Sequence, residues 1–175
     1  MKNIIIISIT FLFLVSCTSS EKKTSNSNQP SIKWLSIDEV QKKMKTSPKK
    51  VLIDVYAEWC GPCKRMAKYT FTDSQVVDYI NKHFYAVKFD AESKPDVNFL
   101  NKNYKNKART HDFALKFGST PRGLAYPTIV YFDEDFKKIN AIPGYYVADQ
   151  YLEVAKYFGD NHYKTKSFQQ YSNMR

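Results

Sequence analysis

Runs of apolar residues separated by polar turns predict the strands of this chain. A nearly continuous apolar run at residues 51–56, broken only by Asp54, is typical of a strand that is buried on both faces. Similar runs predict strands at residues 85–90 and 128–132. Residues 138–142 follow the last of these after an acidic turn, so we expect them to form its antiparallel partner.

Capping residues and amphipathic stretches predict the helices. Ser36 and Glu39 fit a capping box that begins a helix running toward residue 45, and Thr72 and Gln75 fit a second box whose helix reaches about residue 83. Strands that alternate with helices in this order predict an α/β domain with a central mixed sheet flanked by helices. The other expected helices lie at residues 61–69, twice within 96–117 with the second at 112–117, at 147–158, and near 167–172.

The N-terminal segment has the pattern of a targeting signal. Residues 1–16 combine a basic start, an apolar centre and a small residue before Cys17, which is typical of a signal peptide and short for a membrane-spanning helix. Residues 14–17, LVSC, resemble the bacterial lipobox, so Cys17 is expected to become a lipid-modified N-terminus. An ordinary signal peptide with an incidental cysteine is the alternative. We therefore expect a lipidated, polar tether at 17–31 and one domain at 32–175.

The composition supports a packed domain without a nucleic-acid partner. Of the 175 residues, 43% are hydrophobic and 15% aromatic, as expected for a globular core. The formal net charge is +10, but Lys and Arg are scattered along the sequence, which favours a solvated basic surface over a nucleic-acid site. Close to anionic lipid headgroups, the same charge would be mildly attractive.

Two cysteines, Cys60 and Cys63, carry the candidate chemistry. They directly follow the buried strand and begin the next helix, where free backbone amides and the helix dipole stabilise a thiolate and lower the pKa of Cys60. We expect Cys60, at the exposed turn, to be the nucleophile and Cys63 to resolve the mixed disulfide. Pro62 suits the first helical turn, and Gly61 leaves room for a partner chain.

A metal site is the competing interpretation of the cysteine pair. Half of a zinc site would need two further ligands, and His83, His111 and His162 show no matching spacing. These histidines are more simply explained as surface or hydrogen-bonded residues. We therefore predict no metal, and the sequence shows no nucleotide or flavin motif, so no cofactor is expected either.

Asp54 is the candidate proton acceptor. An ionised carboxylate inside an apolar strand is unfavourable, so burial should raise the pKa of Asp54. The hypothesis is that Asp54, through water, takes the proton of Cys63 when this thiol attacks the mixed disulfide. The alternative is a structural acid whose hydrogen bonds are satisfied.

Two separate motifs resemble thioredoxin. Residues 51–64, VLIDVYAEWCGPCK, match it almost residue for residue, and Tyr126-Pro127-Thr128 resembles its cis-proline loop. The resemblance implies a thioredoxin fold with a redox-active Cys60–Cys63 disulfide and Lys88 close to Asp54. Tyr126 departs from the aliphatic residue that is usual in thioredoxin. Residues implied to contact substrate are Trp59, Gly61, Pro62, Tyr126, cis Pro127 and Gly144.

A third segment refines the resemblance. Residues 68–76 are similar to the C-terminal periplasmic domain of the transmembrane thiol:disulfide interchange proteins. This similarity and the lipobox both indicate a location in the cell envelope. The segment 92–125, before the cis-proline loop, is roughly twenty residues longer than in thioredoxin, and long insertions are often functional. It is either a lid that recognises a partner or a surface decoration.

These features predict a thiol-disulfide oxidoreductase of the bacterial cell envelope, anchored by lipid and facing the periplasm. Gly61 and Pro62 between the cysteines resemble the reducing thioredoxins, so we expect it to reduce protein disulfides and to receive electrons from a membrane thiol-disulfide donor. A disulfide oxidase or isomerase is the nearest alternative. The other is a non-catalytic lipoprotein that binds peptides in the groove around Pro127.

Overall fold

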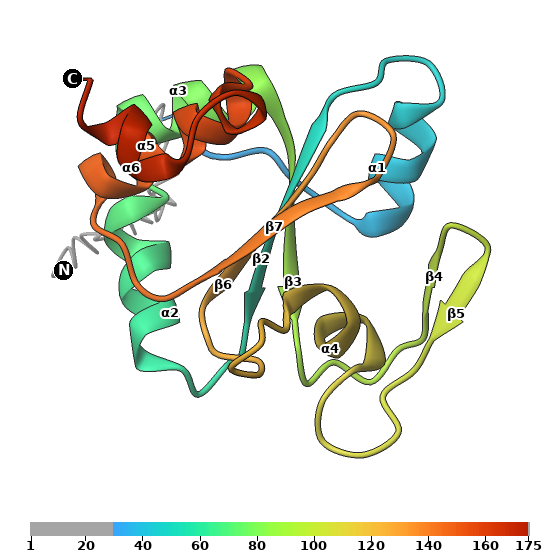
Figure 1. Cartoon of the computed structure of the whole chain (residues 1–175). Coiled ribbons are helices and arrows are strands. Elements are labelled where there is room, and N and C mark those ends of the chain that lie inside the picture. Colours follow the sequence, from blue (N-terminus) through green and yellow to red (C-terminus); the bar gives the residue numbers. More distant parts are fainter. Residues whose placement is uncertain (1–29, 175) are drawn as a thin grey trace, which may run out of the picture.

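A five-stranded mixed sheet forms the centre of the structure (Figure 1). The computed structural model describes residues 30–174. The strand order of the sheet is β1-β3-β2-β6-β7. Strands β1, β3 and β2 are parallel, and β6 and β7 are antiparallel to their neighbours. The predicted mixed sheet is confirmed, and the short edge strand β1 joins the four strands whose residues were predicted. The bounds are β1 (Trp34–Leu35), β2 (Lys50–Tyr56), β3 (Phe84–Asp90), β6 (Thr128–Phe132) and β7 (Lys138–Pro143).

Helices cover both faces of the sheet (Figure 1). In the figure, α2, α3, α5 and α6 lie on one side and α1 and α4 on the other, so each face is buried in its own hydrophobic cluster. The bounds are α1 (Ile37–Met44), α2 (Gly61–Arg65), the π-helical turn η1 (Met66–Thr70), α3 (Ser74–His83), α4 (Asp112–Gly118), α5 (Ala148–Gly159), the 3₁₀ turn η2 (His162–Lys164) and α6 (Phe168–Ser172).

Strand β2 contributes side chains to both layers. Val51, Ile53 and Val55 join the cluster under α1 and α4, and Leu52 joins the cluster under α3 and α5. Because side chains alternate along a strand, Asp54 points to the same face as Leu52. This is also the face on which α2 packs, so the fold brings Asp54 toward the cysteine pair.

The two predicted capping boxes have different outcomes. The Ser36 box is confirmed, since the Ser36 side chain accepts from the Glu39 amide and Glu39 bonds back to the Ser36 backbone. The Thr72 box is wrong: Asp73 caps α3 by accepting from the amides of Gln75 and Val76. An aspartate one residue later is an equally good cap, and it leaves the Thr72 hydroxyl to donate to a backbone carbonyl in the preceding turn.

The long segment before the cis-proline loop contains a hairpin. Its first predicted helix is wrong, because residues 97–104 form the antiparallel strands β4 (Val97–Phe99) and β5 (Lys102–Tyr104). Leu100 and Asn101 make the two-residue turn with φ of 51° and 61°. Phe99 and Tyr104 are buried against Phe113 of α4, the helix that was predicted correctly. The segment is therefore a packed part of the core.

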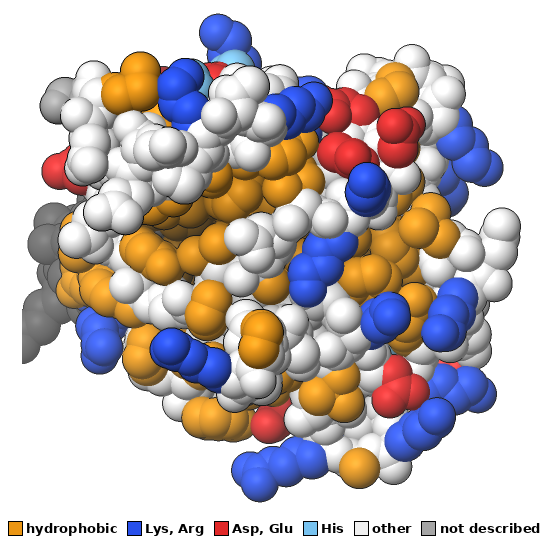
Figure 2. All heavy atoms as spheres, in the orientation of Figure 1, with side chains coloured by type: hydrophobic (Ala, Val, Ile, Leu, Met, Phe, Trp, Pro, Cys, Tyr) orange, Lys and Arg blue, Asp and Glu red, His pale blue; other side chains and the backbone are white. Residues whose placement is uncertain are grey.

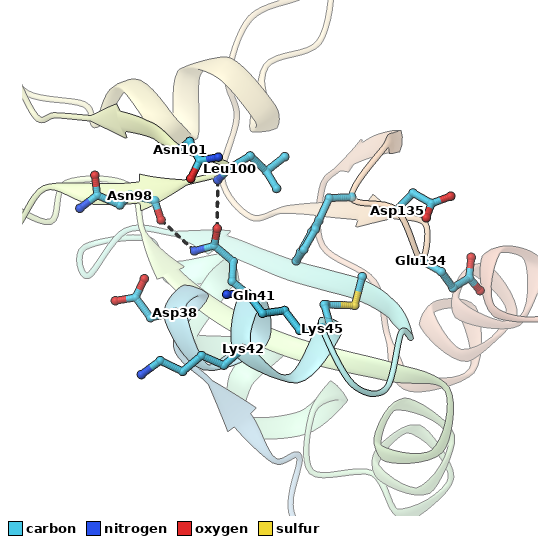
Figure 3. A pocket seen from close by; sticks show the side chains of 11 residues that line it. Asp38, Gln41, Lys42, Lys45, Asn98, Leu100, Asn101, Glu134 and Asp135 are labelled. Carbon is cyan, nitrogen blue, oxygen red and sulfur yellow. Dashed lines mark hydrogen bonds between the residues drawn. The ribbon is translucent and has the colours of Figure 1, made fainter.

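A cleft of about 790 Å³ lies between α1, the hairpin tip and the β6–β7 turn (Figure 3). Gln41 of α1 ties the hairpin to the domain, since it donates to the Asn98 carbonyl and accepts from the Leu100 amide, each at 2.9 Å. Glu134 lines the cleft and forms an ion pair of 2.7 Å with the buried Lys50, at the start of β2. The cleft thus lies at the opposite end of β2 from the cysteines, and its lining includes none of the predicted site residues.

The predicted signal peptide, the lipidated Cys17 and nearly all of the tether lie outside the described residues. Within residues 30–174, none of the helices has both the length and the apolar character needed to cross a membrane. On the face seen in Figure 2, lysine and arginine side chains are spread among apolar and neutral ones. This agrees with the scattered basic residues of the sequence.

Candidate functional site

Cys60 and Cys63 form a disulfide where β2 gives way to α2. Their Cα atoms are 5.3 Å apart. Cys60 is the N-cap residue of α2, and its Sγ accepts a hydrogen bond of 3.1 Å from the Cys63 amide. No acidic residue lies in the first turn of α2, so the amide and the helix dipole can favour negative charge on Cys60 when the disulfide is open.

The prediction that Cys60 is exposed is wrong for this disulfide form. Cys60 is 3% exposed and Cys63 is 7% exposed, so accessibility does not distinguish the two. Tyr126, which lies far along the chain, packs against the cluster that the two cysteines form with Ala57. The surface beside them is nevertheless open, because a Cβ atom placed at Gly61 would meet no atom within 4 Å. A partner chain can therefore approach the disulfide over Gly61.

Asp54 is buried beside Cys63 without a complete set of hydrogen bonds. It is 3% exposed, and its Oδ1 has no hydrogen-bond partner. Burial raises the pKa of Asp54 to about 7, against the opposing effect of the Lys88 charge. A cavity of about 110 Å³ is lined by both Asp54 and Cys63 and has room for water. This arrangement can pass a proton between the two side chains.

Lys88 lies next to Asp54 across the sheet, as the resemblance implied. The two residues are paired in the register of β2 and β3. The Lys88 Nζ lies 4.9 Å from the centre of the Tyr56 ring, and the Tyr56 hydroxyl donates to Glu58 at 3.2 Å. Burial raises the pKa of Tyr56 to about 12, so this hydroxyl keeps its proton at neutral pH. Tyr56 and Glu58 also line the cavity and were missed, although Tyr56 follows Asp54 by two residues on the same face of β2.

The cis-proline loop and the β7 end form the other side of the site. The Tyr126–Pro127 bond is cis, and the Gly144 amide donates to the Pro127 carbonyl at 2.8 Å. Gly144 has a φ of 112°, a region that favours glycine. The Tyr126 ring meets the Trp59 ring edge to face, with centroids 5.7 Å apart. The predicted substrate residues from three chain segments are thus brought together.

Trp59 is held at the rim by a residue that the sequence did not single out. Its ring is 61% exposed, and its Nε1 donates to Glu92 Oε1 at 3.1 Å. Arg109 Nε approaches the same carboxylate oxygen at 3.7 Å. Glu92 and Arg109 both belong to the segment 92–125, and no local motif marks either residue.

The histidines and acids do not assemble a metal site in the described part of the chain. Within residues 30–174, no group of three or more histidine, cysteine, aspartate or glutamate side chains could hold a metal ion. His111 is fully buried, and its Nδ1 accepts from the Phe113 amide at the start of α4. It therefore serves as a helix cap.

Known proteins share this fold. The family model of the thioredoxin-like domain matches residues 37–159. The thiol:disulfide interchange protein DsbD of Actinobacillus pleuropneumoniae is 32% identical over 120 residues, which cover 67% of this chain and 18% of that protein. The chain thus matches only about a fifth of the length of such curated relatives.

Two solved structures are similar in fold. A protein of Bacteroides thetaiotaomicron, proposed to be a disulphide isomerase, is 28% identical with a TM-score of 0.54, covering 75% of this chain and 95% of that one. A thioredoxin-fold protein from Helicobacter pylori is 24% identical with a TM-score of 0.56, covering 73% and 87%. With a family model that matches well over half of its length and a cysteine pair at disulfide distance, the chain belongs to the thioredoxin-like family of thiol-disulfide oxidoreductases.

Proposed function

We propose that the chain is a lipid-anchored reductant of the bacterial cell envelope that transfers electrons to protein disulfides. The observation that carries the proposal is the Cys60–Cys63 pair itself, which begins α2 beside the open surface at Gly61 and opposite the cis Pro127 loop. The similarity to thiol:disulfide interchange proteins supports exchange between protein thiols as the chemistry.

The reaction starts from the dithiol form. The Cys60 thiolate attacks one sulfur of the substrate disulfide, forms a mixed disulfide, and releases the other substrate sulfur as a thiolate that takes up a proton. Cys63 then loses its proton and attacks the Cys60 sulfur. The second substrate sulfur leaves and is protonated in turn. Two electrons and two protons pass to the substrate, and the Cys60–Cys63 disulfide is formed.

Asp54 accepts the proton of Cys63 in the second step. Both side chains line the same cavity, which has room for a water molecule that could carry the proton from the thiol to the carboxylate. A general base works best when its pKa is close to the working pH, and the pKa of Asp54 is raised to about 7. Lys88 contributes by limiting this rise, so that the carboxylate is still partly ionised at neutral pH.

The substrate lies as an extended strand along the cis-proline loop. The backbone groups of Tyr126 pair with it, while Trp59 and Gly144 border the groove on its two sides. Gly61 and Pro62 present no bulky side chain on the approach to Cys60. Because each turnover leaves the protein oxidised, a thiol-disulfide donor in the membrane must reduce it again.

The reduction potential tests the direction of electron flow. We expect the purified protein, equilibrated in thiol buffers with trapping of free thiols, to have a potential close to that of thioredoxin, about −270 mV. A potential near the strongly oxidising end, about −120 mV, would instead assign it to disulfide formation. An intermediate value near −180 mV, together with refolding of a scrambled disulfide protein, would favour an isomerase.

The proposed lipid attachment at Cys17 has its own test. We expect Cys17→Ser to abolish labelling by radioactive palmitate, because it removes the thiol that would carry the lipid. Thr18→Ser is the matched control and should keep the label. Palmitate labelling that survives Cys17→Ser would contradict the lipoprotein assignment.

A further inference from the structure

The segment 92–125 brings a loop to the rim of the site. Its hairpin and α4 are fixed in the core by aromatic contacts, such as that between Phe99 and Phe113 with centroids 5.4 Å apart. Asn106 donates to the carbonyls of Glu92 and Ser93 at 3.1 and 2.9 Å, and the His111 amide donates to the Ala91 carbonyl at 2.7 Å. The loop between them is therefore held at the end of β3, next to Trp59.

This loop has two charged side chains: Lys107 pairs with Asp112 at 3.4 Å, whereas Arg109 approaches the site. Its Nε lies 3.7 Å from Glu92, the carboxylate that also holds the Trp59 indole, and its side chain is 84% exposed. Thr110, the next residue, interacts with the Tyr126 hydroxyl. The Arg109 charge also interacts electrostatically with this hydroxyl. Because the Arg109 side chain is largely open to solvent beside the Trp59–Glu92 pair, it can bind a carboxylate of a substrate.

Arg65 occupies the opposite side. It follows Gly61 by four residues and so shares its helical face, which is the open face beside Cys60. Its guanidinium lies 5.4 Å from the centre of the Tyr145 ring, directly after Gly144. Among the described residues, no carboxylate lies within ion-pair distance of Arg65. The acid nearest in sequence, Glu58, instead accepts from Tyr56 beside the Asp54 cavity.

We propose that Arg65 and Arg109 select protein substrates that carry aspartate or glutamate beside the target disulfide. A guanidinium presents a planar fork that binds a carboxylate through two parallel hydrogen bonds. The two arginines flank the groove on either side of Cys60. An acidic residue before the substrate cysteine and one after it would therefore each bind one arginine. The inference rests on the proposed function, because it names the substrate class of the same site.

Two peptides test the proposal. Each contains one disulfide, with glutamate next to both cysteines in the first peptide and glutamine in the second. We expect the reduced protein to have a kcat/KM about fivefold higher for the glutamate peptide at low salt, since rim charges mainly accelerate association. The preference should shrink as salt is raised to about 1 M, where charges are screened beyond about 3 Å.

Variants assign the preference to the two arginines. Arg65→Gln and Arg109→Gln should each lower the ratio of the two kcat/KM values by about half, and the double variant should bring it close to one. Lys45→Gln combined with Lys137→Gln removes the same charge at the far end of the sheet and should keep the ratio. A ratio of one in the wild-type protein, or a ratio that survives the double variant, would overturn the proposal.

The design separates this inference from the proposed function. If the protein oxidises the reduced peptides instead of reducing the disulfides, the direction is wrong, but the glutamate peptide should still react faster. If the arginine variants lose activity equally toward both peptides, their role is structural and the selection of acidic substrates fails while thiol-disulfide exchange stands.

Discussion

Cys60→Ser is expected to abolish disulfide reduction, with a loss of at least about 10³-fold, because it removes the attacking thiol at the N-cap of α2. Cys63→Ser should instead stop the reaction halfway. Cys60 would still attack the substrate, and the mixed disulfide would persist because the resolving thiol is missing. Reduction of insulin measures the loss, and mass spectrometry after non-reducing electrophoresis identifies the cysteine in the trapped complex.

Both cysteines are buried, so the two variants are needed to decide which cysteine attacks the substrate and which resolves the mixed disulfide. At 3% and 7% exposed, neither Cys60 nor Cys63 is favoured by accessibility, and the assignment depends on the position of Cys60 as the N-cap. Cys17→Ser is the control and should keep full exchange. A complex trapped through Cys63 in the Cys60→Ser variant would reverse the roles, and retained cellular activity in that variant would favour a non-catalytic peptide-binding protein.

The sequence predicted those parts of the fold that short-range chemistry determines. The buried strand at 51–56, the Ser36 capping box and the cysteine pair at a helix start all depend on residues within a few positions of one another. The hairpin at 97–104 depends on distant residues instead. Its turn has Leu100 where asparagine or glycine is usual, and burial of Phe99 against Phe113 and Phe132 stabilises it. No local pattern conveys those contacts.

The same distinction applies to the site. The resemblance placed Lys88 beside Asp54 and a cis bond before Pro127, and both are found. The hydrogen bond from Trp59 to Glu92 joins residues 33 positions apart, and Arg109 reaches it from the far side of the hairpin. The packing of Tyr126 against the cysteine cluster likewise arises only in three dimensions, so the local sequence did not indicate that Cys60 is buried.

Asp54 is expected to make the protein less stable as the pH rises. In the unfolded chain the carboxyl group has its ordinary pKa of 3.8, whereas burial raises the pKa of folded Asp54 to about 7. Between these values the folded state keeps a proton that the unfolded state has lost, so the free energy of unfolding falls with increasing pH and levels off above about 7. About three pKa units correspond to at most about 4 kcal/mol.

Asp54→Asn should remove this contribution and, with it, the proton acceptor. The variant should be more stable than the wild-type protein above pH 7, as measured by urea unfolding at pH 5 and pH 8, yet its resolving step should be about 10²-fold slower. Rapid acid quenching of the mixed disulfide measures that step, which in the wild-type protein should accelerate through a midpoint near pH 7.

Asp78→Asn, on the exposed face of α3, is the matched control and should alter neither the pH dependence of unfolding nor the resolving step. The pH dependence of unfolding and the rate of the resolving step test the two roles of Asp54 independently. Parallel stability curves for the wild-type protein and Asp54→Asn would show that burial does not hold a proton on Asp54. A pH-dependent difference in stability with an unchanged resolving rate would leave Asp54 as a buried structural acid, and another group in the cavity would have to accept the proton of Cys63. Glu58 is the remaining carboxylate on that lining, and a Glu58→Gln variant that slows resolution in place of Asp54→Asn would transfer the role to it.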